Sequence, residues 1–264
     1  MLKDITIGQY IPGESFIHRL DPRSKIIALM LYIIALFLLF NAIGYYAIVI
    51  FSVVIILASQ VPVRIYLKGI RPLAFIIVLT MVLHFFMTPG TPIFNIGPLK
   101  VTQEGFYHGL QMGARLILLI TVTSVLTLTT SPISLTDGIE RLLNPLKKVG
   151  VPAHELAMMM TIALRFIPTL IEETEKIMKA QMARGADFES GNIIKRAKAL
   201  IPLLVPLFVS AFRRADDLAM AMEARCYRGG ENRTRMKQLK YTFIDFIAII
   251  ISMGFLVFAI YLRL

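Results

Sequence analysis

Cysteine is almost absent from this sequence, with Cys226 the only one among 264 residues. A single thiol excludes a disulfide framework, a four-cysteine zinc site and an iron–sulfur cluster within the chain. The four histidines show no metal-ligand spacing, and no GxxxxGK[ST], HExxH or GxSxG motif occurs. We therefore expect a non-catalytic chain without metal or cofactor, so that any ATP-driven motor, with its ATP and Mg²⁺, lies on partner chains.

Charge is missing from long stretches. No charged residue occurs in Ile26–Ala58, which as one helix would measure roughly 50 Å against a hydrocarbon core of about 30 Å. Asn41 and Gly44 near its middle favour two short spans joined by a tight turn. With 56% hydrophobic residues and a mean hydropathy of +0.71, the chain is predicted to be a multi-pass protein of the cell membrane.

Five transmembrane helices are predicted, with an external loop over Pro89–Pro98. A basic loop carrying Arg64, Lys68 and Arg71 shares its side with the basic amino terminus, which places that terminus in the cytoplasm and the carboxyl terminus outside. No cleaved signal peptide is expected. The predicted spans are Lys25–Phe40, Tyr45–Ser59, Pro72–Thr88, Gly105–Thr129 and Tyr241–Tyr261.

The charge collects between residues 130 and 240, which hold 18 of the 28 Lys+Arg and 12 of the 17 Asp+Glu. Two apolar segments there, Leu156–Ile171 and Leu200–Phe212, are interrupted by Pro168, Pro202 and Pro206, so we interpret them as parts of amphipathic helices. Two further spans would keep the same topology and stay an alternative. The fold class is thus all-α, divided into a cytoplasmic segment 1–24, membrane helices 25–130, a cytoplasmic module of crossed coupling helices 131–240, and a last span 241–264.

Two segments of this module share one pattern, Ala-x-x-Ala-Arg, and each is predicted to end a helix. Alanines at i and i+3 leave one face nearly bare, so that a partner backbone can approach, and the arginine projects from the helix end. A guanidinium there can make bidentate hydrogen bonds to a partner carboxylate. The alternative is an ordinary helix stop, favoured by the helix dipole. The segments are Ala180–Gly185 and Ala221–Cys226.

Methionine is concentrated in the same helices and suits a surface that accepts several partners, although filling gaps in a helical core is an equal alternative. The candidates are Met158, Met159, Met160, Met178, Met182, Met220 and Met222. Ionisable residues near the spans are further candidates for function, with local pairing as the alternative. These are His84, Arg115 and Asp245.

The run Gly8–Lys25, GQYIPGESFIHRLDPRSK, resembles the opening of the transmembrane T component of energy-coupling factor transporters (EcfT/CbiQ-like), and the two Ala-Arg ends resemble that family's paired coupling motifs. The resemblance covers essentially the whole chain. It implies a subunit that joins two ATP-binding cassette ATPases to a small membrane protein capturing a vitamin or metal ion, in the shared type that serves several capture subunits. No nucleic-acid partner is implied.

By this resemblance the ATPase-docking residues are Ala183, Arg184, Gly185, Ala224, Arg225 and Cys226. Cys226 stands where the family pattern leads us to expect glycine or serine. Two alternatives stay open, a membrane-embedded lipid-modifying enzyme whose basic module binds headgroups, and a conventional ABC permease subunit. The sequence leaves open the substrate, which arginine meets which ATPase, and whether more than five spans are present.

Overall fold

The computed structural model describes residues 10–39, 41–96, 99–186, 188, 192, 194, 198–229 and 239–263. Gly8 and Gln9, which begin the amino-terminal run, lie outside the described residues. The chain divides into two compact units. The larger, here named the bundle, comprises Gly8–Gly138 and Leu239–Leu264, and the smaller, named the module, is built on Ile139–Gln238.

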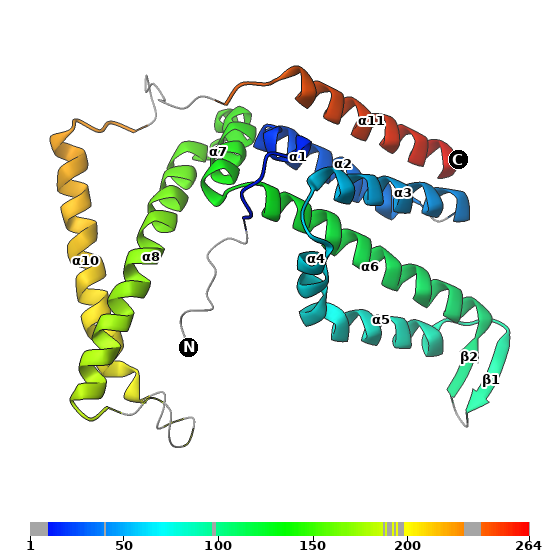
Figure 1. Cartoon of the computed structure of the whole chain (residues 1–264), viewed down its shortest axis with the longest axis horizontal. Coiled ribbons are helices and arrows are strands. Elements are labelled where there is room, and N and C mark those ends of the chain that lie inside the picture. Colours follow the sequence, from blue (N-terminus) through cyan, green and yellow to red (C-terminus); the bar gives the residue numbers. More distant parts are fainter. Residues whose placement is uncertain are drawn as a thin grey trace. The chain divides into compact units, whose positions relative to one another are not determined.

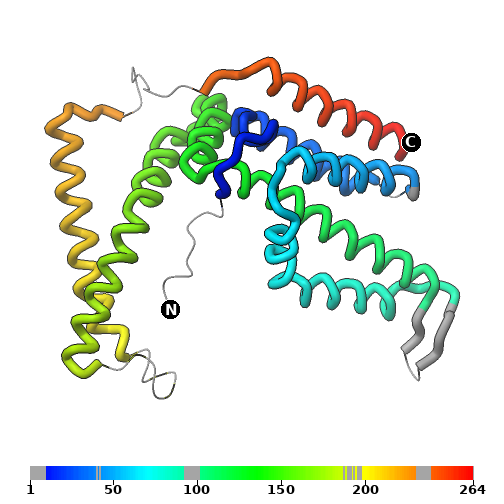
Figure 2. The backbone as a smooth tube through the Cα atoms, in the orientation of Figure 1, coloured from blue at the N-terminus to red at the C-terminus, as the bar shows by residue number. Residues whose placement is uncertain are grey.

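The described part is helical apart from one β-hairpin, in agreement with the predicted all-α class (Figures 1 and 2). The bundle elements are α1 (Phe16–Arg19), α2 (Pro22–Leu38), α3 (Ala42–Ser59), α4 (Val63–Ile70), a 3₁₀ turn Arg71–Leu73, α5 (Ala74–Met87), β1 (Pro92–Ile96), β2 (Leu99–Thr102), α6 (Gln103–Thr129) and α11 (Phe243–Arg263). Helix α7 (Pro132–Leu143) spans the division, and the module continues with a 3₁₀ turn Asn144–Val149, α8 (Ala153–Ala183) and α10 (Ile201–Ala224).

The charge-free run forms two helices, as predicted. Helix α2 begins at a capped proline, with the Asp21 carboxylate accepting from the Arg23 N–H at 2.9 Å. It ends at Leu38, and Asn41 occupies the N-cap position of α3. The break therefore falls before Asn41, and Gly44, expected in the turn, lies in the first turn of α3.

Two loop predictions are corrected by the structure. The basic segment after α3 is the amphipathic helix α4, because Tyr66 is buried while Arg64 and Lys68 point outward. The segment Pro89–Pro98, expected to be a loop, contains strand β1, which pairs antiparallel with β2. Both segments therefore contain regular secondary structure, which charge and proline content alone do not indicate.

Glycines on α6 allow α5 to approach closely. A Cβ at Gly105 would lie 2.7 Å from the His84 carbonyl oxygen, and one at Gly109 would lie 2.5 Å from the Phe85 ring. These glycines are four residues apart and so share one helix face. The α5–α6 pair is therefore held at a separation that side chains at these positions would prevent.

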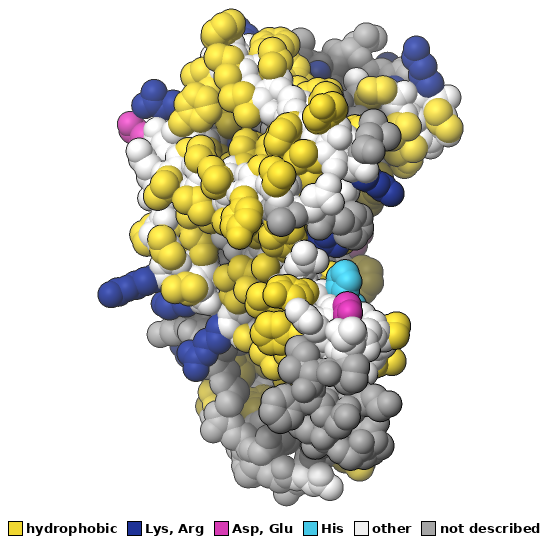
Figure 3. Space-filling model, turned by 90° about the vertical axis from the view of Figure 1, so that its right-hand side faces the viewer, with side chains coloured by type: hydrophobic (Ala, Val, Ile, Leu, Met, Phe, Trp, Pro, Cys, Tyr) yellow, Lys and Arg dark blue, Asp and Glu magenta, His cyan; other side chains and the backbone are white. Residues whose placement is uncertain are grey.

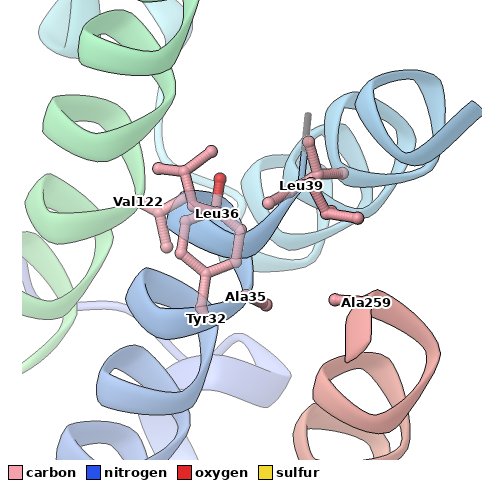
Figure 4. Packing of buried hydrophobic residues seen from close by; sticks show 7 residues of the cluster. Tyr32, Ala35, Leu36, Leu39, Val122 and Ala259 are labelled. Atoms are coloured by element: carbon pink, nitrogen blue, oxygen red, sulfur yellow. The ribbon is translucent and has the colours of Figure 1, made fainter. Parts of the chain in front are cut away.

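The bundle core forms where α2, α3, α6 and α11 meet (Figure 4). The Tyr32 hydroxyl of α2 hydrogen-bonds to the Ser52 hydroxyl of α3 at 2.7 Å, and the Phe51 and Phe255 rings stack with centroids 4.6 Å apart. The buried hydrophobic members are Tyr32, Ala35, Leu36, Leu39, Ile48, Val122 and Ala259. This cluster joins the last helix to the first long one.

Among the described residues, four helices are long and apolar enough to cross a membrane by length and composition, Val63–Met87, Gln103–Thr129, Ala153–Ala183 and Phe243–Arg263, and a shorter apolar helix covers Ile43–Ser59. Exposed hydrophobic side chains cover much of the face in Figure 3, as expected of lipid-facing surface. Helix α2, predicted as the first span, has 17 residues and is not among these.

The interruptions expected at Pro168 and Pro206 are wrong, since both prolines lie inside continuous helices. A proline removes one backbone hydrogen bond and bends a helix, and a long helix packed against a neighbour tolerates that loss. Helix α8 thereby reaches 31 residues and joins the candidate spans, although the sequence assigns it to the cytoplasmic module.

Candidate coupling-helix ends

Helices α8 and α10 end alike, as the sequence predicts. Their last helical residues are Ala183 and Ala224. Arg184 and Arg225 occupy the C-cap positions with nearly equal backbone angles, φ −88° and ψ 6° for the first and φ −91° and ψ 11° for the second. The shared sequence pattern therefore produces a shared backbone geometry.

Each end is closed by the same two backbone hydrogen bonds, which together form a Schellman motif. In the first bond, the N–H of the residue after the cap arginine donates to the carbonyl three positions earlier in the chain. In the second, the N–H of the following residue donates to the carbonyl five positions earlier than itself. The bonds run from Gly185 to Met182 (2.9 Å), Ala186 to Gln181 (2.9 Å), Cys226 to Glu223 (2.8 Å) and Tyr227 to Met222 (3.0 Å).

The motif requires a left-handed residue directly after the arginine. Gly185 has φ +88° and Cys226 has φ +54°. Glycine takes this conformation without a steric penalty, whereas cysteine pays the penalty of an L-residue. The departure of Cys226 from the family pattern is thus a matter of backbone strain as well as of side-chain size.

The two helices run antiparallel. Near the end of α8, the Gln181 amide donates to the Pro202 carbonyl at the start of α10 (3.5 Å). Further along, Arg214 Nη2 donates to Glu173 Oε2 at 2.8 Å, and the Ser210 hydroxyl donates to Glu173 Oε1. This ion pair is partly exposed, so it orients the helices more than it stabilises them.

At the other end of the pair, Tyr227 joins the tip of α10 to the start of α8. Its hydroxyl lies 3.3 Å from His154 Nε2 and donates to Met158 Sδ at 2.9 Å. His154 Nδ1 in turn lies 3.0 Å from Glu140 Oε1 of α7. Nothing in the local sequence indicates the two Tyr227 contacts, because they join residues that are 73 and 69 positions apart.

Because the helices are antiparallel, the two cap arginines lie at opposite ends of the pair. Helix α10 has 24 residues and is therefore about 36 Å long. Arg184 and Arg225 are both exposed, and so are the alanines of both segments. The arrangement presents two equivalent small-residue ends with outward guanidinium groups, far enough apart to contact two separate protein surfaces.

The methionine candidates differ in how exposed they are. Met159, Met160, Met182 and Met220 are exposed, whereas Met158, Met178 and Met222 are half-buried. The exposed members are accessible to a partner, so the partner-surface interpretation stays a prediction for them, and the half-buried members are less accessible.

Arg115 and Asp245 both hydrogen-bond to backbone groups, and each has a partner far away in the sequence. Arg115 Nη2 donates to the Leu39 carbonyl at the end of α2 (2.9 Å), and the fully buried Asp245 carboxylate accepts two backbone N–H groups at 2.7 Å. His84 lies in α5 and is half-buried. Within the described ranges, no group of three or more His, Cys, Asp or Glu side chains is placed to hold a metal ion.

Several long apolar helices, together with a second unit built on a pair of helices, define the chain as a polytopic membrane protein. The family model described as "CbiQ: Cobalt transport protein" matches residues 13–236. The chain belongs to this family.

The relatives are similar over nearly the whole chain. Proteins named "Energy-coupling factor transporter transmembrane protein EcfT" are 63% identical in Thermosediminibacter oceani (94% of this chain, 94% of the relative), 61% in Clostridium kluyveri (94% and 93%) and 52% in Bacillus subtilis (92% and 92%). The chain is therefore a multi-pass, non-catalytic transmembrane component of an energy-coupling factor transporter. The alternatives of a lipid-modifying enzyme and a conventional permease subunit are set aside.

Proposed function

We propose that this chain couples ATP hydrolysis on two partner ATPases to substrate import by a separate capture subunit. The carrying observation is the pair of identical Schellman ends, each with an exposed arginine, at opposite ends of one antiparallel helix pair. One ATPase subunit docks at Ala183-Arg184-Gly185 and the other at Ala224-Arg225-Cys226. ATP and Mg²⁺ are held by those partners.

Each docking contact uses the same chemistry. The bare alanine face lets the helix end enter a groove, and the guanidinium pairs with a carboxylate inside it. The segment 131–240, which contains the module, then lies on the cytoplasmic side with the amino terminus, while the carboxyl terminus is external. The exposed methionines Met159, Met182 and Met220 contact capture subunits for vitamins or metal ions, and their adaptable side chains allow several such subunits to share this chain.

Charge reversal tests the docking proposal. Arg184→Glu and Arg225→Glu should each weaken the association of one ATPase subunit by about 30-fold or more, since each leaves a buried partner carboxylate facing a like charge. The double variant should lose both subunits. Affinity purification of the tagged chain from membranes, with mass spectrometry of the co-eluting proteins, measures this directly.

Arg213→Glu is the matched control, because it reverses an exposed arginine on the same helix away from its end. The control should retain both ATPases. If the Arg184→Glu/Arg225→Glu chain retained both ATPases and normal uptake, the docking proposal would be wrong. Gel filtration of each variant separates lost docking from a misfolded chain.

A further inference from the structure

From Tyr10 onward, where the described residues begin, the chain crosses between the bundle and the module twice. It leaves the bundle after α6, through Thr129–Gly138, and returns to it before α11, through Leu239–Thr242. A displacement of the module can reach the bundle helices along the chain through these two connections. The side chains that hold the connections are therefore candidates for transmitting it.

The first connection is held by Lys25. Its side chain is buried, with only 8% of the residue exposed, and its ammonium group donates to the Thr129 carbonyl at 2.9 Å and to the Thr130 hydroxyl at 3.1 Å. A third contact, to the His18 carbonyl, is 3.5 Å long. A buried ammonium that donates to carbonyl and hydroxyl oxygens fixes the backbone where α6 ends.

The second connection is held by Asp245. One carboxylate oxygen accepts from the Thr242 N–H at 2.7 Å, which caps the start of α11, and the other accepts from the Asp21 N–H at 2.7 Å. The guanidinium of Arg23 lies 3.8 Å above the Tyr241 ring and donates to the Asp21 carboxylate at 2.9 and 3.0 Å. The returning chain is thus fixed to the same short segment.

Both connections meet at Asp21–Lys25, here named the junction segment. Its Pro22 also packs against Gly138 of α7, where an added Cβ would lie only 2.9 Å from the Pro22 Cβ. Thr129 lies 104 positions after Lys25, and Asp245 lies 224 positions after Asp21. The junction segment therefore binds parts of the chain that are far apart in sequence. Within the described part of the segment, the Ser24 hydroxyl is buried without a hydrogen-bond partner.

We propose that the junction segment transmits displacement of the module to the membrane helices, with Lys25 and Asp245 as its positioning residues. The proposal rests on the coupling function proposed above. Buried charges with several specific partners resist displacement, because separating them leaves a charge unpaired in a low-dielectric interior. Motion of either connection therefore moves the start of α2, which packs on α11 and α6 in the bundle core.

The test measures motion of the bundle and ATP hydrolysis separately in the assembled transporter. Genetically encoded spin-labelled amino acids replace the exposed residues Ile43 of α3 and Phe75 of α5, with Cys226 left in place, and the distance between the labels is recorded with and without MgATP. Lys25→Met should keep both ATPases and their phosphate release. The fraction of molecules that change distance with MgATP should fall at least about fivefold, as expected when coupling free energy is lost.

Milder variants keep the test decisive if Lys25→Met disturbs assembly. Lys25→Arg retains donors for the two oxygens and should restore the distance change. Thr130→Val removes only the hydroxyl contact and should reduce the change in part. Thr127→Val is its matched control, since the Thr127 hydroxyl bonds to Ser124 within α6 (3.1 Å), and it should behave as native.

The outcomes separate the junction proposal from the docking proposal. If Lys25→Met keeps both ATPases and shows the native MgATP-dependent change in distance, the junction proposal is overturned while the docking proposal stands. If Lys25→Met does not assemble, the same result in Thr130→Val overturns it. A native complex whose label distance does not respond to MgATP overturns it as well. A native chain that binds no ATPase overturns both.

Discussion

Replacing Cys226 with glycine should stabilise the end of α10. Cys226 holds the left-handed conformation, φ +54°, that glycine holds after α8, φ +88°. This conformation costs an L-residue about 1–2 kcal/mol, and the greater freedom of glycine in the open end offsets about 0.5–1 kcal/mol. The expected net stabilisation of the closed end is therefore about 0.5–1 kcal/mol.

Hydrogen exchange of the full-length chain, followed by mass spectrometry, measures this effect. The amides of Cys226 and Tyr227 close the Schellman motif at 2.8 and 3.0 Å, so they exchange when the end opens. Cys226→Gly should slow their exchange about two- to fivefold. The reciprocal change, Gly185→Cys, should accelerate exchange at the end of α8 by a similar factor.

Cys226→Ala is the matched control for the thiol. Alanine keeps the strain of an L-residue but removes the sulfur, so its exchange should equal that of the native chain. If Cys226→Ala slowed exchange as much as Cys226→Gly, or if Gly185→Cys left the α8 end unchanged, backbone strain would not be the reason for the difference between the two ends.

Two further changes test packing in each unit. Tyr227→Phe removes the hydroxyl contact with His154 and should loosen the tip of α10 by about 0.5–1.5 kcal/mol, seen as faster exchange there without loss of bundle stability. Gly109→Ala should destabilise the bundle by about 1–3 kcal/mol, because the new methyl group meets the Phe85 ring, and should lower the melting temperature in detergent. Gly69→Ala, where the nearest atom is 3.9 Å away and alanine favours helix α4, is its control and should melt no lower than the native chain.

Local signals in the sequence predict much of this fold. Asn41 predicts the break in the long apolar run, and the two Ala-Arg segments predict the ends of α8 and α10. These features depend on backbone preferences of a few neighbouring residues. The helix α4 also has a local signal, since Val63, Tyr66 and Ile70 repeat at helical spacing, but counting charges hides it.

Other features depend on contacts between distant residues, which no local pattern specifies. Lys25 and Asp245 look like isolated charges near span ends, and only the fold shows that both serve the junction segment. Tyr227 has no motif of its own, and its role follows from the antiparallel packing of α10 on α8. Pro168 looks like a helix break because propensity describes an isolated helix and omits the packing of a long one.

The antiparallel arrangement limits how ATPase motion can act on the module. The contact of Gln181 with Pro202 lies toward the Arg184 end and Tyr227 lies at the Arg225 end, with the Glu173–Arg214 ion pair between them. If the two ATPases approach each other, each moves one end of the same pair. Arg184 lies 11 residues beyond Glu173 on α8, and Arg225 lies 11 residues beyond Arg214 on α10, so both ends are about 16 Å from this ion pair along their helices. Under the coupling proposal, a change of angle between α8 and α10 that pivots at the ion pair would therefore displace the two docking ends by similar amounts.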